Sequence, residues 1–247
     1  KNKIKPSSIK IKKIENFFKK KYRSKYALLF PSGRAAINSI LKYHQIDRSK
    51  ITNVPLWTSS CLLHALTSIT NVSVKNKNTH CKIIVHKWGN TFKLKEKIKK
   101  NQLLINDSAD CFPNKKFRPF ENNSNFEILS LPKLIGSFGG GIILTNKKKF
   151  YTNSKKIQKK NIIFAKKQSK RKFISSFINK ENLDWRYYES FNISMDFNSV
   201  ENIYQCLPNY DLNKNIILRR TKLVKRHFKN ILNDEKRIGP CLIFNLK

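Results

Sequence analysis

The stretch from Phe126 to Thr145, FEILSLPKLIGSFGGGIILT, constrains the fold of this chain more than any other. Its apolar runs predict one strand over Phe126–Leu131 and a second over Gly141–Thr145, joined by a turn that carries Lys133 and a run of glycines. A lysine held on a rigid turn between buried strands can lose solvation, which lowers its pKa and leaves a neutral amine able to attack a carbonyl. Taken alone, Lys133 is better interpreted as a solvated loop lysine.

The rest of the chain alternates between strand and helix patterns. Strands are expected at Tyr26–Phe30, Ile51–Val54, Val72–Val74, Lys82–His86 and Leu103–Asn106, and helices at Ile9–Tyr22, Arg34–Tyr43, Ser60–Ile69 and Leu94–Lys99. This alternation indicates an α/β domain built on a mostly parallel sheet. Beyond Thr145 the sequence is basic and weakly helical over Lys147–Lys172. It then predicts a basic helix at Ile216–Leu232 and a single strand within Gly239–Leu246.

The charge of the chain is extreme. Lysine and arginine number 52 against 15 aspartate and glutamate residues, a formal net charge of +37 over 247 residues. Such a charge is typical of proteins that bind nucleic acids or anionic membranes. The lysine runs do not alternate with stackable aromatics as a single-strand binding groove would, so a compositional bias that places lysines on every solvated face is favoured. A basic nucleic-acid-binding protein is kept as a third hypothesis, behind the two that are described at the end of this subsection.

Other classes find little support. No apolar run approaches the roughly 18 residues of a membrane helix, so membrane insertion is not expected. The five cysteines are widely spaced and form no CxxC pair, a pattern that fits reduced thiols in a cytoplasm. The histidines show no metal-ligand spacing, and we predict no metal site.

Several polar residues follow directly after predicted strands, where ligands bind in parallel α/β sheets. Ser32, Gly33 and Arg34 join a strand to a helix N-terminus, which is either an anion site or an ordinary helix cap. Asp107 ends a strand and is either a buried carboxylate facing a cation or the cap of a turn. Trp57 provides either a flat surface for a ring or core packing.

Together, these residues meet the needs of pyridoxal phosphate (PLP). The phosphate requires a helix N-terminus, and the ring an aromatic surface such as that of Trp57. The pyridine nitrogen requires a carboxylate, for which Asp107 is the candidate, because a protonated ring withdraws the electrons released at Cα of the bound amine. The aldehyde requires a lysine that forms a Schiff base, for which Lys133 is the candidate.

The segments that carry these residues resemble the DegT/StrS family of PLP-dependent sugar aminotransferases. In family order, between Lys25 and Leu232, they are YALLFPSGRAAI, VPLWTSS, IIVHKWGN, LLINDSAD, SLPKLIGSFGGGIILT and FNISM. The resemblance implies the large domain of a type I PLP transferase, a mostly parallel sheet flanked by helices, with a reduced C-terminal α+β portion. We expect an N-terminal helix over residues 1–24, the PLP-binding α/β domain over 25–178, and the helical remainder of a small domain over 179–247.

The resemblance also implies roles for single residues. Lys133 would be the Schiff-base lysine and proton shuttle, and Asp107 the partner of the ring nitrogen. The implied cofactor-binding residues are Ser32, Gly33, Arg34, Trp57, Asp107, Asp110, Ser130, Lys133 and Asn192; the implied substrate-binding residues are His86 and Trp88. Asn192 would reach the phosphate in the neighbouring subunit, which implies a homodimer. Dehydratases of the family carry histidine in place of the lysine, so Lys133 favours an aminotransferase.

The leading hypothesis is therefore transamination of a keto-sugar carried on a nucleotide diphosphate, with glutamate as amino donor. Its products would enter surface polysaccharides or a modified-sugar pathway. The second hypothesis keeps the fold without turnover, as a degenerate member that binds a ligand or partner. Two departures from the family motivate it: Asp110 stands where glutamine or histidine contacts the phenolic oxygen of PLP, and most of the small domain is missing after Leu232.

Overall fold

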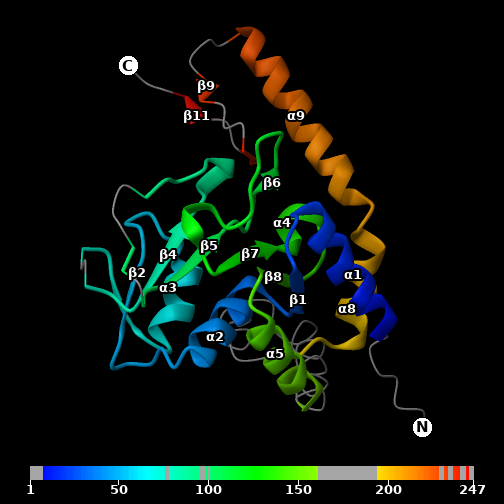
Figure 1. Cartoon of the computed structure of the whole chain (residues 1–247). Coiled ribbons are helices and arrows are strands. Elements are labelled where there is room, and N and C mark those ends of the chain that lie inside the picture. Colours follow the sequence, from blue (N-terminus) through cyan, green and yellow to red (C-terminus); the bar gives the residue numbers. More distant parts are fainter. Residues whose placement is uncertain are drawn as a thin grey trace, which may run out of the picture.

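The computed structural model describes residues 8–75, 78–94, 98–99, 101–160, 194–227, 231–232, 236–239 and 243–244. Its centre is a seven-stranded sheet in the order β1-β8-β7-β5-β4-β2-β3, flanked by helices (Figure 1). The strands are β1 Tyr26–Phe30, β2 Ile51–Asn53, β3 Asn71–Ser73, β4 Cys81–Val85, β5 Leu103–Asp107, β7 Phe126–Ser130 and β8 Gly141–Thr145. The predicted α/β class and mostly parallel sheet are confirmed.

The helices and small strand pairs surround this sheet. The α-helices are α1 Ser8–Lys21, α2 Gly33–Tyr43, α3 Ser60–Thr67, α4 Leu131–Ile135, α5 Lys148–Lys160, α8 Phe197–Cys206 and α9 Asn209–His227. Short 3-10 turns are η1 Lys87–Gly89 and η2 Glu121–Asn123. Away from the main sheet, β6 Phe112–Pro113 pairs with β10 Arg237–Ile238, and β9 Ile231–Leu232 with β11 Ile243–Phe244. No helix within the described ranges is long and apolar enough to cross a bilayer.

The direction of β8 determines where the loops of the sheet meet. β8 runs antiparallel to both of its neighbours, β1 and β7, which therefore point the same way. In the register, Gly141 at the start of β8 is opposite Phe30 on one side and Ser130 on the other. The loops that leave β1 and β7 consequently emerge beside each other at Gly141.

Two hydrophobic cores cover the two faces of the sheet. Successive side chains of a strand point to opposite faces, and in β1 Leu28 and Phe30 enter one core while Leu29 enters the other. The first core includes residues of α2 and α3, and the second includes residues of α1, α4, α8 and α9. The long helix α9 extends beyond the sheet along one side of the molecule (Figure 1), and Tyr210 is its one buried residue among those described.

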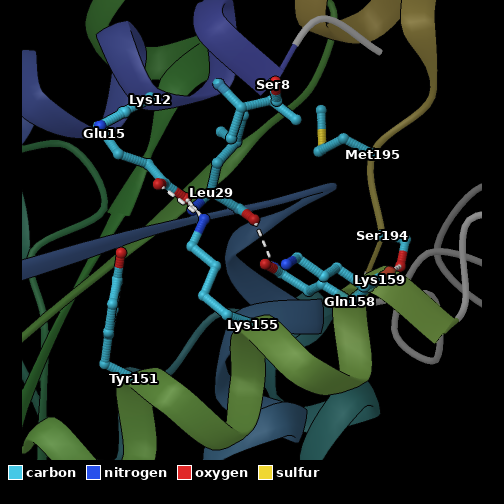
Figure 2. Close-up of a pocket in the computed structure, with 11 residues that line it drawn as sticks. Ser8, Lys12, Glu15, Leu29, Tyr151, Lys155, Gln158, Lys159, Ser194 and Met195 are labelled. Carbon is cyan, nitrogen blue, oxygen red and sulfur yellow. Dashed lines mark hydrogen bonds and ion pairs between the residues drawn. The ribbon is translucent and has the colours of Figure 1, made fainter. Parts of the chain in front are cut away.

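The outer edge of β1 is covered by side chains of two helices. Glu15 of α1 accepts a hydrogen bond from the Leu29 amide at 2.9 Å, and Gln158 of α5 donates one to the Leu29 carbonyl at 2.8 Å (Figure 2). Burial raises the pKa of Glu15, an effect that its ion pair with Lys155, at 2.6 Å, opposes. These contacts surround a cavity of about 310 Å³ and satisfy backbone groups that an edge strand otherwise leaves unpaired.

Several predicted elements differ in the structure. The turn expected around Lys133 is the short helix α4, with Pro132 in its first turn and Gly136 at its C-cap with φ 70°. The helix expected at Ile216–Leu232 begins at Asn209 and ends at His227, because Tyr210 anchors a polar first turn that has no apolar periodicity.

Of two further predictions, one is confirmed in part and one is wrong. A strand is present within the predicted stretch Gly239–Leu246, at Ile243–Phe244, and Ile238 belongs to another strand pair. The helix expected at Leu94–Lys99 is not helical at the described Leu94, Ile98 and Lys99. The predicted boundary at residue 178 lies outside the described residues, and the three-part division of the chain remains a prediction.

The glycine run from Gly139 to Gly141 packs directly against the loop that leaves β1. The Gly140 amide donates to the Pro31 carbonyl at 2.7 Å, and the Gly140 carbonyl accepts from Leu131 at 3.0 Å. A Cβ atom on Gly141 would lie 2.5 Å from the Gly33 nitrogen, closer than real Cβ contacts allow. Glycine at this position therefore lets the β1–α2 loop and the β7–α4 loop share one side of the sheet.

We predict that Gly141→Ala lowers the free energy of unfolding by about 1–3 kcal/mol, because the new methyl group meets rigid backbone. Gly136→Ala is the matched control: its Cβ has no atom within 4 Å, so its cost is the strain of a positive φ, about 1 kcal/mol. Urea denaturation of both variants measures the difference. A smaller loss in Gly141→Ala than in Gly136→Ala would contradict the close approach.

Candidate active site

One cavity of about 540 Å³ lies at the ends of β1, β5 and β7, where the sequence places its strand-end polar residues. Six of the predicted site residues line it: Ser32, Gly33, Arg34, Asp107, Ser130 and Lys133. They come from three loops that are distant in sequence. The register at Gly141 explains why the β1 and β7 loops meet, and β5 pairs with β7 directly.

The first turn of α2 forms one wall of the cavity. The Ser32 hydroxyl accepts a hydrogen bond from the Ala35 amide at 3.1 Å, so Ser32 caps the helix as well as lining the cavity. Backbone amides at a helix N-terminus and the helix dipole favour a negative charge. Arg34 follows in the same turn, and Ser130 lines the cavity from the end of β7. This wall can bind a phosphate.

Asp107 lies at the end of β5 and also lines the cavity. Its Oδ1 accepts a hydrogen bond from the Ala109 amide at 3.0 Å. Burial raises the pKa of Asp107 to about 6, an effect that the Lys133 ammonium and the Ala109 hydrogen bond oppose. A partly buried carboxylate of this kind is stabilised by a second cation, such as the protonated ring nitrogen of PLP.

Lys133 reaches the cavity from α4. Its Nζ lies 4.0 Å from the Asp110 carboxylate, at the outer limit of an ion pair. The loss of solvation expected for this lysine is not observed, because 55% of its side chain is exposed. The short helix places Lys133 at the mouth of the cavity and not between the strands. Asp110 pairs loosely with Lys133 and is not among the residues that line the cavity.

The structure does not bring Trp57 to this cavity. Trp57 is 46% exposed and lines a different cavity of about 310 Å³, separate from the one beside β1, with the Phe92 ring edge-on at a centroid distance of 6.0 Å. From the segment after β2, the cavity is lined instead by Ser59, Cys61 and Leu62, which sequence reasoning missed. The loop after β2 was identified, but residue type alone did not show which of its side chains faces the cavity.

The two predicted substrate residues lie in different surroundings. His86 is fully buried, and its Nδ1 accepts a hydrogen bond from the Phe92 amide at 3.0 Å. Burial, and then the charge of Arg237, lower the pKa of His86 well below its ordinary value. Trp88 is 41% exposed, with Lys87 Nζ 4.2 Å from the ring centroid. Neither lines the cavity. Asn192 lies outside the described residues.

Further residues that sequence reasoning did not assign to the site are Ile37, Ala109, Ile128, Pro132, Phe138, Gly139 and Gly140. The position of Ala109, two residues after an aspartate that ends a strand, is a signal that could have identified it. Phe138 and the glycines belong to the run that marked the Lys133 segment from the start. These residues complete the lining of the cavity.

We predict that Asp107 makes folding stability depend on pH. The folded-state pKa is raised to about 6, so the folded protein binds this proton more tightly than the unfolded chain. The stability due to Asp107 is therefore greatest below its ordinary pKa of about 3.9 and falls as the pH rises through 6. Urea denaturation from pH 4 to 7, without added PLP, should show this fall in the parent relative to Asp107→Asn. Buried Glu15 contributes equally to both proteins and cancels. Parallel curves would contradict the raised pKa.

Comparisons with known proteins agree with this geometry. Residues 14–245 match a family model described as "putative PLP-dependent aminotransferase". No curated protein sequence matches the chain.

Three solved structures share the fold. DesV from S. venezuelae, in complex with a ketimine intermediate, has 12% identity and a TM-score of 0.62, covering 96% of this chain and 68% of its own. A DegT DnrJ EryC1 StrS aminotransferase from Brucella abortus has 12% identity and a TM-score of 0.59, with coverages of 95% and 69%. GDP-4-keto-6-deoxy-D-mannose-3-dehydratase from E. coli, with bound hydrated PLP, has 16% identity and a TM-score of 0.61, with coverages of 99% and 73%.

The family model spans most of the chain, and the cavity joins a helix N-terminus that can bind a phosphate, a carboxylate and a lysine, as PLP requires. The chain therefore belongs to the PLP-dependent aminotransferase family, and its cofactor is pyridoxal phosphate.

Proposed function

We propose that this protein is a sugar aminotransferase of the DegT/StrS type, which transfers the amino group of glutamate to a keto-sugar carried on a nucleotide. The observation that carries the proposal is the single cavity that gathers the α2 N-terminus, Asp107 and Lys133. The structural similarity to a DegT DnrJ EryC1 StrS aminotransferase and to a dehydratase of a GDP-linked keto-sugar supports this substrate class. Lys133 favours an aminotransferase over a dehydratase.

The residues of the cavity have different roles in this proposal. PLP, when bound, supplies an electron sink for the charge that develops at Cα of the amino substrate. The first turn of α2, with Ser32, Gly33 and Arg34, would hold the phosphate, and Ser130 at the end of β7 would contact it as well. Asp107 holds a proton on the ring nitrogen, because its carboxylate is stabilised by that positive charge.

Lys133 has two tasks in this proposal. Its Nζ would hold the cofactor covalently at the aldehyde carbon. The same amine, when free, would accept and return the proton at Cα of the amino substrate. The position of α4 at the mouth of the cavity suits this exchange, because the side chain can swing away from the bound substrate without leaving the site.

The charge of the chain is consistent with a diphosphate substrate. A net charge of +37 attracts anions and speeds their encounter with the protein. We place the enzyme in the cytoplasm, where its five cysteines would stay reduced, and in the synthesis of surface polysaccharides or modified sugars.

We further propose that the enzyme is a homodimer whose partner covers the mouth of the cavity. Phe138 lines the cavity, yet 93% of it is exposed. Leu56, three residues before the lining residue Ser59 in the sequence, is 81% exposed. Large apolar side chains exposed beside a functional cavity are typical of an interface. Asn192, outside the described residues, would then contact the phosphate in the neighbouring subunit.

We predict that adding PLP to the protein produces the visible absorbance band of a lysine-bound cofactor and that Lys133→Ala abolishes it. Lys149→Ala, which removes an exposed lysine of α5, is the matched control and should retain the band. Borohydride reduction followed by peptide mapping should label Lys133 alone. Labelling of another lysine would refute the assignment of Lys133.

The same spectrum tests turnover. Glutamate should remove the band in the parent, and a nucleotide-linked keto-sugar should restore it. A band that glutamate leaves unchanged would favour a degenerate family member that binds the cofactor without transamination. Restoration by keto-acids but by no nucleotide-linked keto-sugar would contradict the proposed substrate class.

We also predict that Phe138→Asp converts the dimer into monomers, because a charge in an apolar interface must be desolvated. Sedimentation velocity of the parent, of Phe138→Asp and of the exposed-lysine control Lys149→Ala measures the effect. A parent that sediments as a monomer would contradict the proposed assembly.

A further inference from the structure

A buried ion pair joins the C-terminal strand β10 to the central sheet. Arg237 Nη2 lies 2.7 Å from Glu127 Oε1, and both side chains have no exposed surface. Burying two charges is costly unless their remaining hydrogen-bonding groups find partners. Arg237 Nη1 donates to the Thr91 hydroxyl at 3.3 Å, and the guanidinium lies 5.0 Å from the centroid of the Phe117 ring.

The Glu127 carboxylate receives two more hydrogen bonds. Its Oε1 accepts from the Ser108 hydroxyl at 2.7 Å, and its Oε2 accepts from the Phe120 amide at 3.1 Å. Glu127 therefore connects β10 to β5 and to the loop before β7. Hydrogen bonds to a charged group are among the stronger ones in a protein interior.

Ser108 directly follows Asp107, the predicted partner of the cofactor ring. The Ser108 amide donates to the Ile128 carbonyl at 2.9 Å, and the Asp107 carbonyl accepts from the His86 amide at 2.9 Å. Main-chain bonds thus hold the β5 end to both neighbouring strands. The Ser108 hydroxyl is the side-chain contact that links this end to Glu127 and, through it, to Arg237.

We propose that Arg237 is a positioning residue for Asp107. Through Glu127 and Ser108 it holds the end of β5 so that the Asp107 carboxylate faces the cofactor cavity. This inference rests on the proposed function, in which Asp107 holds the ring proton. It assigns a role at the cofactor site to a strand 110 residues away from Glu127 in the sequence.

Strand β10 is held firmly enough to act as an anchor. Ile238 pairs with Phe112 of β6, and the Asn114 amide donates to the Lys236 carbonyl at 2.9 Å. A Cβ atom on Gly239 would lie 2.1 Å from the Trp88 carbonyl carbon, so the two backbones are in direct contact. The anchor consequently supports η1, which carries Trp88, as well as the end of β5.

The experiment compares Arg237→Met with Lys236→Met. Lys236 is the neighbouring residue of the same segment, but its ion pair, at 2.7 Å, is with Glu121 of η2 and not with β7. Arg237→Met should weaken PLP binding about tenfold, the loss expected for one hydrogen bond to a charged group, whereas Lys236→Met should leave it unchanged. Fluorescence titration of each protein with PLP measures the dissociation constants.

A double-mutant cycle separates positioning from a general structural role. If Arg237 acts through Asp107, Arg237→Met should have little further effect on PLP affinity in an Asp107→Asn background. A general loss of structure would instead lower the affinity by about the same factor in both backgrounds. Additive effects in this cycle would overturn the proposal.

Two further variants guard against loss of folding, because Arg237→Met leaves a buried charge on Glu127. Arg237→Met/Glu127→Gln removes that charge and keeps one oxygen for Ser108, so it should fold and recover part of the affinity. Arg237→Lys keeps the positive charge and should lie between the parent and Arg237→Met. A fully folded Arg237→Met/Glu127→Gln with affinity no better than that of Arg237→Met would contradict transmission through Glu127.

Amide hydrogen exchange, measured without PLP, keeps the inference separate from the proposed function. The peptide spanning residues 107–111 should exchange about tenfold faster in Arg237→Met/Glu127→Gln than in Lys236→Met, while β8 stays protected. If the parent binds no PLP, the proposed function fails, and this exchange still decides whether Arg237 holds the end of β5. Unchanged exchange in a folded variant overturns the positioning role in either case.

Discussion

The close packing of the glycine run against the β1–α2 loop is the contact on which the rest of the site depends. Because β8 runs antiparallel between β1 and β7, the ends of those two strands flank Gly141. A side chain at Gly141 would have to displace the backbone of Ser32 and Gly33. The helix N-terminus that can bind a phosphate and the helix that carries Lys133 are therefore neighbours only because this position has no Cβ atom.

Two carboxylates on adjacent strands show how the protein separates structure from chemistry. Glu127 accepts bonds from Arg237, Ser108 and Phe120 and has no exposed surface, so its hydrogen-bonding capacity is used within the fold. Asp107 accepts a hydrogen bond from the Ala109 amide, and burial raises its pKa to about 6. A carboxylate whose pKa burial raises is less stable in its charged form, and such groups concentrate at functional sites. The contrast identifies Asp107 as the one available to a ligand.

The sequence predicted the sheet better than the site. The strands Tyr26–Phe30 and Gly141–Thr145 were predicted with their observed bounds, because short apolar runs bounded by turn residues are a strong local signal. The orientation of the side chains in the loop after β2 was not predicted, because no periodicity indicates which residue of a loop faces a cavity. Trp57 was chosen for its ring, whereas Ser59 lines the wall. Arg237 could not be found, since its partner is 110 residues away and only the fold brings them together.

The C-terminal segment therefore does more than close the fold. After α9 extends away from the sheet (Figure 1), the chain returns in β10 and inserts a charged side chain beside the strand ends. A hydrophobic side chain of similar volume could fill that space at lower desolvation cost. A charged side chain with several hydrogen bonds can instead fix the orientation of the groups that it contacts, because each bond restricts an angle as well as a distance. If, as we propose, Arg237 orients the Asp107 carboxylate toward the cofactor ring, this requirement accounts for a buried arginine at a position that packing alone would give to an apolar residue.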